Sequence, residues 1–273
     1  MGTYAITGAA SGLGAATKAR LEADGHRVIG IDLHDTDVNV DLSKAEGRAE
    51  AIAKVTELSG GTLDGFVPFA GLAAATGRPG GLIVSVNYFG AVVLLEGLRP
   101  LLARGTNPSV VLISSNSTTS QPNWPVEVAE ACFAGDEAAA IKATEPFGDY
   151  AAIQAYPATK AALAWYARTR SAEYMAEGIR LNAIAPGLIE TPMTAEGRKD
   201  PLTAEGMEMF LGTIPAGRGG RPEEIASLVA FLLGDESLFF VGSLIFCDGG
   251  TDAAFRGKDW PKVWEVDASA FQQ

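Results

Sequence analysis

Short apolar runs alternate with longer amphipathic stretches along almost the whole chain. Short buried runs are typical of strands, and amphipathic stretches between them are typical of covering helices. The pattern therefore predicts βαβ units with a parallel sheet flanked by helices on both faces, an α/β doubly wound fold. The expected strands are Tyr4–Ile6, Arg27–Ile31, Gly65–Phe69, Val110–Ser114, Arg180–Ala185 and Leu244–Cys247. The expected helices are Ala15–Asp24, Ala45–Leu58, Leu82–Leu102, Ala158–Ala176 and Pro222–Leu233.

Nothing in the sequence resembles an interdomain linker or an internal repeat, so we expect one catalytic domain over residues 1–273. Two segments break the alternation. Residues 116–155 are long for a connection, which usually marks a functional or appended element, and we expect helices at Val126–Phe133 and Asp136–Ala143. The tail, residues 251–273, holds four aromatic residues that would be costly to expose, so it is expected to pack on the domain: Phe255, Trp260, Trp264 and Phe271.

The charge balance argues against several classes of partner. The formal net charge is -12, and such a surface repels nucleic acid and anionic membranes. No uninterrupted apolar run approaches the length that crosses a bilayer, and no signal peptide is evident. We therefore expect a soluble protein with no nucleic-acid and no membrane partner.

The cysteine and histidine content limits location and metal binding. Cys132 and Cys247 are the only cysteines, too few for a disulfide framework, which favours a cytoplasmic protein. The two histidines, His26 and His34, leave no His/Cys ligand set at usable spacing. We expect no bound metal.

A glycine-rich turn joins the first expected strand to the first expected helix, over Thr7–Gly14. Glycines let the backbone turn tightly and approach a pyrophosphate, whose charge then meets the helix N-terminus. The spacing is GxxxGxG and not GxGxxG, and a sharp turn alone also favours glycine. In this context we predict a Rossmann-type dinucleotide site that includes Gly8, Ser11, Gly12, Leu13 and Gly14.

An acidic residue follows the second strand, about twenty residues beyond the glycine turn. The Asp32 carboxylate is placed to accept hydrogen bonds from ribose hydroxyls and would repel a 2′-phosphate, so NAD is favoured over NADP. The alternative is a solvated acid at a strand end. Asp41 and Leu42 are candidates for the adenine edge, although an Asp before a helix is also a common N-cap.

Tyr156 and Lys160 stand four residues apart in an expected helix, so their side chains share one face. A nearby ammonium lowers the pKa of a phenol, which suits the pair for proton transfer. Ser115 ends an apolar strand at the edge where α/β sheets bind ligands, and it is the candidate second donor to a substrate oxygen. Serine is also an ordinary turn residue at such a place.

Taken together, these residues resemble the short-chain dehydrogenase/reductase family, in order, from Thr3 to about Gly250. The resemblance implies that Tyr156 is the acid/base, Ser115 orients the substrate oxygen, and Lys160 assists. It implies that Asn87 supports a water relay and that Thr191 contacts the nicotinamide carboxamide. It also adds cofactor-binding positions after two strands, namely Ala70, Gly71, Pro186, Gly187 and Ile189.

Two departures from the family pattern stand out. Pro68-Phe69 precede Ala70-Gly71 where the family usually has two asparagines, which puts the local sheet structure in doubt. Ser115 and Tyr156 are 41 positions apart, where about a dozen is typical. The long insertion resembles the bacterial 3-alpha-hydroxysteroid dehydrogenase/carbonyl reductase subgroup, which implies oxidation of steroid 3-hydroxyls and reduction of bulky ketones.

The expected partner is therefore a small apolar alcohol or ketone. Apolar residues after Gly187 favour such a substrate, unless they simply pack on the domain: Leu188, Met193, Met207, Met209, Phe210 and Leu211. The alternatives are a sugar, polyol or acyl-ketone dehydrogenase and, in a different class, a catalytically silent NAD-binding protein.

A homodimer or homotetramer is expected. The insertion is placed to block the contact that the Asn87 and Tyr156 helices commonly make, which would leave Pro222–Leu233 and Leu244–Cys247 to hold a dimer. Alternatively the insertion is only a lid over the substrate cleft.

Overall fold

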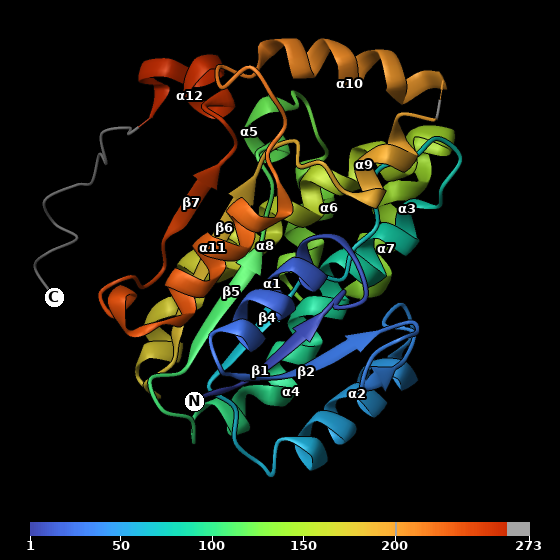
Figure 1. The fold of residues 1–273 in the computed structure, drawn as a ribbon. Coiled ribbons are helices and arrows are strands. Elements are labelled where there is room, and N and C mark those ends of the chain that lie inside the picture. The colour runs from blue at the N-terminus through green and yellow to red at the C-terminus, as the bar shows by residue number, and fades with distance from the viewer. Residues whose placement is uncertain (200, 261–273) are drawn as a thin grey trace, which may run out of the picture.

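In the computed structural model, which describes residues 1–199 and 201–260, seven parallel strands form one sheet in the order β3-β2-β1-β4-β5-β6-β7 (Figure 1). The strand order reverses between β1 and β4, which confirms the predicted α/β doubly wound fold. The strands are β1 Thr3–Thr7, β2 Arg27–Asp32, β3 Val38–Asn39, β4 Gly65–Pro68, β5 Ser109–Ile113, β6 Arg180–Pro186 and β7 Leu244–Cys247.

Helices cover both faces of the sheet and divide the core in two. Tyr4 and Ile6 of β1 pack toward α1 and α11, whereas Ala5 between them faces the core under α2, α4 and α8, as the two-residue strand period requires. The longer helices are α1 Gly12–Ala23, α2 Ala45–Leu58, α4 Gly90–Leu102, α6 Val126–Phe133, α7 Glu137–Thr144, α8 Ala151–Met175, α10 Pro201–Thr213 and α11 Pro222–Leu233. The short ones are α3 Gly80–Ile83, α5 Ser117–Ser120, α9 Pro192–Gly197 and α12 Thr251–Arg256.

The departures from the predicted elements have local causes. The edge strand β3 was not predicted, because two residues give no visible alternation. The helix predicted to begin at Leu82 begins at Gly80 and contains a π-helical segment, Val84–Phe89, which the α-helical period does not reveal. The prediction of one domain over residues 1–273 stays a prediction.

The stretch Gly80–Leu102 is long and apolar enough by length and composition to span a membrane, with a mean hydropathy of 1.7, although polar and charged residues interrupt it and no uninterrupted apolar run of this length was expected. The expectation counted uninterrupted apolar residues, whereas mean hydropathy averages over interruptions. Of its most apolar window, 61% is buried inside the protein, as in a core helix. Leu94, Leu95 and Leu98 supply that core contact.

The insertion folds onto the domain as the two predicted helices, α6 and α7, followed by a 3-10 segment, Glu145–Tyr150. Its Trp124 and Phe133 rings lie 6.2 and 6.4 Å from the Trp165 ring of α8. On the other side α7 lies against α3, where Gly80 and Gly81 leave room for Thr144 and Ile141. The insertion therefore covers the first half of α8 and packs against the π-helical segment.

Part of the tail also packs. α9, α10 and α12 gather at the end of the molecule toward which β5 and β7 point (Figure 1). The Phe255 ring lies 6.4 Å from that of Phe210 in α10, and the Arg256 guanidinium lies 5.9 Å from the Trp260 ring. The remaining predicted aromatic contacts, Trp264 and Phe271, lie outside the described residues.

Candidate active site

A cleft opens at the carboxyl ends of β1, β4, β5 and β6, where the strand order reverses. It brings together every predicted site residue except Asp41, and eight further side chains that the sequence did not identify as binding residues. The predicted residues in its lining are Gly8, Ser11, Gly12, Leu13, Gly14, Asp32, Leu42, Ala70, Gly71, Asn87, Ser115, Tyr156, Lys160, Pro186, Gly187, Ile189 and Thr191.

The glycine turn needs its glycines for backbone reasons. Gly8 and Gly12 have φ of 68° and 53°, in the left-handed region that favours glycine. A Cβ on Gly14 would lie 2.1 Å from the Gly8 carbonyl oxygen, and a Cβ on Gly8 would lie 2.8 Å from the Ala70 nitrogen. Because α1 carries no acidic residue in its first turn, its positive end is open to a phosphate.

Asp32 joins this turn to the end of β2. Its carboxylate accepts hydrogen bonds from the Ala10 and Leu33 backbone N–H groups at 3.0 and 2.7 Å. Among the described residues that line the cleft, Lys160 is the one cation, and it belongs to α8 rather than to the β2 end. A 2′-phosphate near Asp32 would therefore meet a carboxylate and no compensating side chain from the lining, as expected of a site that prefers NAD.

The structure does not bring Asp41 into the cleft. Its carboxylate accepts hydrogen bonds from the Ser43 backbone N–H at 3.0 Å and the Ser43 hydroxyl at 2.6 Å. The hydrogen bond from the Ser43 hydroxyl is the main cause that lowers the pKa of Asp41. Asp41 therefore organises the turn before α2, a part similar to the helix N-cap that was the alternative interpretation of this residue. Of Asp41 and Leu42, only Leu42 lines the cleft.

The proton-transfer residues meet where β5 ends against α8. Tyr156 and Ser115 both line the cleft, and Ser115 Oγ accepts a hydrogen bond from the Ser117 N–H at 3.1 Å. Lys160 Nζ lies 5.7 Å from the centre of the Tyr156 ring and donates to the Ile113 carbonyl at 3.0 Å. The three side chains thus converge on one wall of the cleft.

The pKa values of this group differ from the expected pattern. Burial raises the pKa of Tyr156, with the Ser115 hydrogen bond acting in the opposite direction, so the expected net lowering by Lys160 is wrong for this structure. Burial also lowers the pKa of Lys160 to about 8. This shift disfavours the charged ammonium, which was expected to lower the pKa of Tyr156. Near neutral pH Tyr156 is therefore a phenol, able to donate its proton to a carbonyl oxygen.

Asn87 lies in the π-helical segment and fixes the loop after β4. Its amide accepts a hydrogen bond from the Leu72 N–H at 2.8 Å and donates to the Leu72 carbonyl at 3.1 Å. The Thr7 hydroxyl accepts from the Ala70 N–H at 2.9 Å. These bonds hold the cleft wall although the family's asparagines are absent. A part for Asn87 in a water relay stays a prediction.

The loop after β6 completes the far wall. A Cβ on Gly187 would lie 2.7 Å from the Asp248 Cα, so only glycine fits the close approach to β7. Of the six apolar residues expected to favour an apolar substrate, Met193 lines the cleft, whereas Leu188 lines a separate small cavity and Met209 is 69% exposed. Unpredicted lining residues include Leu33, Val40 and Leu72, which no spacing in the sequence distinguishes from core residues.

Known proteins resemble this chain over nearly its whole length. This chain is 41% identical over 256 residues to a 3-alpha-hydroxysteroid dehydrogenase/carbonyl reductase of Comamonas testosteroni. The match covers 94% of this chain and 98% of the Comamonas protein. The structure of a 3-alpha-hydroxysteroid dehydrogenase from Pseudomonas sp. B-0831, complexed with NADH, superposes with a TM-score of 0.89 at 43% identity, covering 94% of this chain and 99% of that chain.

A relative of lower sequence identity and a family model that covers part of the chain also match. A levodione reductase of Leifsonia aquatica is 28% identical over 280 residues, covering 92% of this chain and 94% of that protein. A family model described as enoyl-(acyl carrier protein) reductase matches residues 138–252, the part that contains Tyr156 and Lys160.

Proposed function

The chain belongs to the short-chain dehydrogenase/reductase family of oxidoreductases, and we propose that it uses NAD to interconvert a secondary alcohol and a ketone on an apolar substrate, a hydroxysteroid or another bulky carbonyl compound. The observation that carries this proposal is that Ser115, Tyr156 and the buried Lys160 line one cleft, with Lys160 Nζ 5.7 Å from the centre of the Tyr156 ring. The names of the two hydroxysteroid dehydrogenases described above supply the substrate class.

The residues have distinct parts in the proposed reaction. The glycine turn with Gly8 and Gly12, together with Asp32, would hold NADH, which when bound would supply hydride for the carbonyl carbon. Tyr156 donates its proton to the carbonyl oxygen, and Ser115 donates a hydrogen bond to the same oxygen, so charge that develops there meets two donors. In the oxidative direction Tyr156 first releases its own proton, and the resulting phenolate accepts the hydroxyl proton from the alcohol. Lys160, held against the Ile113 carbonyl, keeps a titratable amine next to the phenol.

A panel of substrates tests this proposal directly. The purified protein should oxidise 3-hydroxysteroids or other apolar secondary alcohols with NAD, measured as NADH absorbance, and the reverse reaction should consume NADH with the matching ketone. Turnover only of sugars, polyols or acyl ketones would contradict the substrate class and leave the chemistry standing. NAD binding without turnover of any member would instead support a silent NAD-binding protein.

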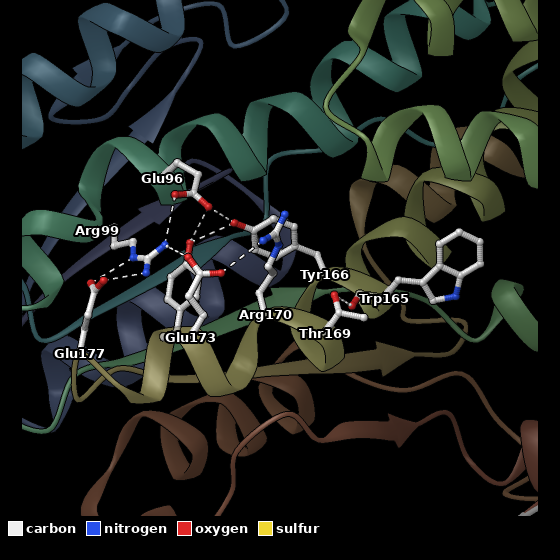
Figure 2. Close-up of polar contacts among 9 residues, drawn as sticks. Glu96, Arg99, Trp165, Tyr166, Thr169, Arg170, Glu173 and Glu177 are labelled. Atoms are coloured by element: carbon white, nitrogen blue, oxygen red, sulfur yellow. Dashed lines mark hydrogen bonds and ion pairs between the residues drawn. The ribbon is translucent and has the colours of Figure 1, made fainter. Parts of the chain in front are cut away.

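We also propose a cytoplasmic homodimer. The insertion covers the first half of α8, and beyond it the faces of α4 and α8 carry an ion-pair network around Arg99, which lies 2.8 Å from Glu173 and 2.7 Å from Glu177 (Figure 2). Glu96 accepts from Tyr166 and Tyr174 in the same network. Because these charged side chains already pair with one another within the protein, contact of this face with a second copy would add little stabilisation.

The edge of the sheet that β7 forms is better suited to contact with a second copy of the chain. β7 is an edge strand whose residues are all only partly buried, and Phe239, just before it, is fully exposed. Sedimentation should show a dimer, and Phe239→Asp should shift it toward monomer. A tetramer in which the α4 and α8 faces are protected from hydrogen exchange would contradict the proposal.

A further inference from the structure

Arg48 of α2 is a buried cation outside the cleft, only 3% exposed. Its guanidinium pairs with Glu137 of the insertion, 89 residues away, through two hydrogen bonds of 2.7 and 2.6 Å. Such a two-point contact between a guanidinium and a carboxylate fixes orientation as well as distance.

The remaining donors of Arg48 hold backbone carbonyls in the turn before α2, which includes the cleft residue Leu42, and in the π-helical segment. Nε donates to the Leu42 carbonyl at 2.8 Å, and Leu42 itself lines the cleft. Nη2 donates to the carbonyls of Ser43 and Ser85, both at 3.3 Å. Ser85 belongs to the π-helical segment that presents Asn87. One side chain therefore links the insertion, the turn before α2 and the Asn87 segment.

We propose that the Arg48–Glu137 pair positions the adenine end of the NAD site, so that the insertion contributes to cofactor affinity although none of its helices lines the cleft. The proposal rests on the cleft being the NAD site. Arg48 and Glu137 are positioning residues: they act through Leu42 and Ser85 and touch no reacting atom.

The burial of Arg48, whose side chain is 4% exposed against 31% for Glu137, explains why the effect should be large. An exposed ion pair can be lost with little consequence, but a cation left in the interior without its carboxylate must find water or another partner. The nearest way to achieve this is for Arg48 to move, and any movement releases the carbonyls of Leu42 and Ser85. The cleft wall at Leu42 then becomes mobile, and NAD must order it again on binding.

The test compares Glu137→Gln with Glu130→Gln, a matched control that removes the same charge from an exposed position on α6. NAD and ADP-ribose affinities are measured by calorimetry, and kcat is measured at saturating NAD. We expect Glu137→Gln to raise the Kd of both ligands about tenfold, in the usual range of coupling between sites, and to leave kcat within about twofold. Glu130→Gln should match the wild type.

A second variant separates positioning from stability. In Arg48→Met combined with Glu137→Gln, apolar packing replaces the buried charge and can restore thermal stability, but methionine has no donor for the Leu42 and Ser85 carbonyls. NAD affinity should therefore stay low while the melting temperature recovers. Unchanged NAD affinity in both variants, or equal losses of affinity and kcat, would overturn the inference. A wild-type protein that binds no NAD would instead refute the assignment of the cleft.

Discussion

Replacing Lys160 with methionine is expected to make the protein more stable while abolishing turnover. Burial lowers the pKa of the Lys160 amine from 10.5 to about 8. Since one pKa unit corresponds to about 1.4 kcal/mol, charging this amine costs about 3 kcal/mol more in the folded protein than in the unfolded chain. Methionine avoids that cost but loses the hydrogen bond to Ile113, worth about 1 kcal/mol. The free energy of unfolding at pH 7 should rise by about 2 kcal/mol.

The two proteins should also differ in how their stability depends on pH. The folded pKa of Lys160 lies below the unfolded value, so between them the unfolded chain binds more protons and the free energy of unfolding rises with pH. Below the folded pKa both states are protonated, and the full penalty applies. Between pH 7 and pH 9 the wild type should gain about 1 kcal/mol from this residue, and Lys160→Met should gain nothing.

Urea unfolding followed by tryptophan fluorescence at pH 7 and pH 9 measures both effects. Lys142→Met, at an exposed lysine of α7, is the control and should change stability by less than about 0.5 kcal/mol. A Lys160→Met protein less stable than wild type at pH 7 would refute the reasoning. Parallel pH dependence in variant and wild type would refute it equally.

Three further substitutions test the cleft. Tyr156→Phe should lower kcat more than tenfold while calorimetry shows NAD affinity retained, because the hydroxyl transfers the proton and the ring mainly packs; a tenth of wild-type rate or more would remove Tyr156 from the acid/base role. Asp32→Ala should narrow the preference for NAD over NADP in kcat/KM, and a wild type that uses both equally would contradict the assignment. Ser114→Ala removes a hydrogen bond of 2.8 Å to the Lys160 carbonyl, so the melting temperature should fall by about 2–4 °C; an unchanged value would mean that this bond does not hold α8.

Sequence patterns predicted the fold and most of the cleft because the relevant signals are local. The glycine turn, Asp32 and the helical spacing of Tyr156 and Lys160 each depend on neighbours within one or two elements. Asp41 was placed in the cleft although its carboxylate turns toward Ser43. A position next to a binding residue does not determine where the side chain points.

The sequence could not reveal what depends on burial. Tyr156 and Lys160 were expected to interact through charge, but how far each pKa moves depends on the side chains packed around it, which the tertiary structure alone supplies. The Arg48–Glu137 pair was invisible for a similar reason, since no spacing rule connects residues 89 apart on α2 and α7.

Several features that oppose stability lie at the cleft. Lys160 is a buried amine that donates to the Ile113 carbonyl, Asn87 lies in a π-helical segment, and Gly8 and Gly12 adopt left-handed backbone conformations. A fold selected for stability alone would replace such features, because each costs free energy that packing must offset. Arg48 is equally buried but fully paired, and it lies one layer behind the cleft. The residues at the cleft thus lower stability, whereas the Arg48–Glu137 ion pair behind them is satisfied. This arrangement is expected when an outer layer of residues holds the reactive residues of an inner layer in place.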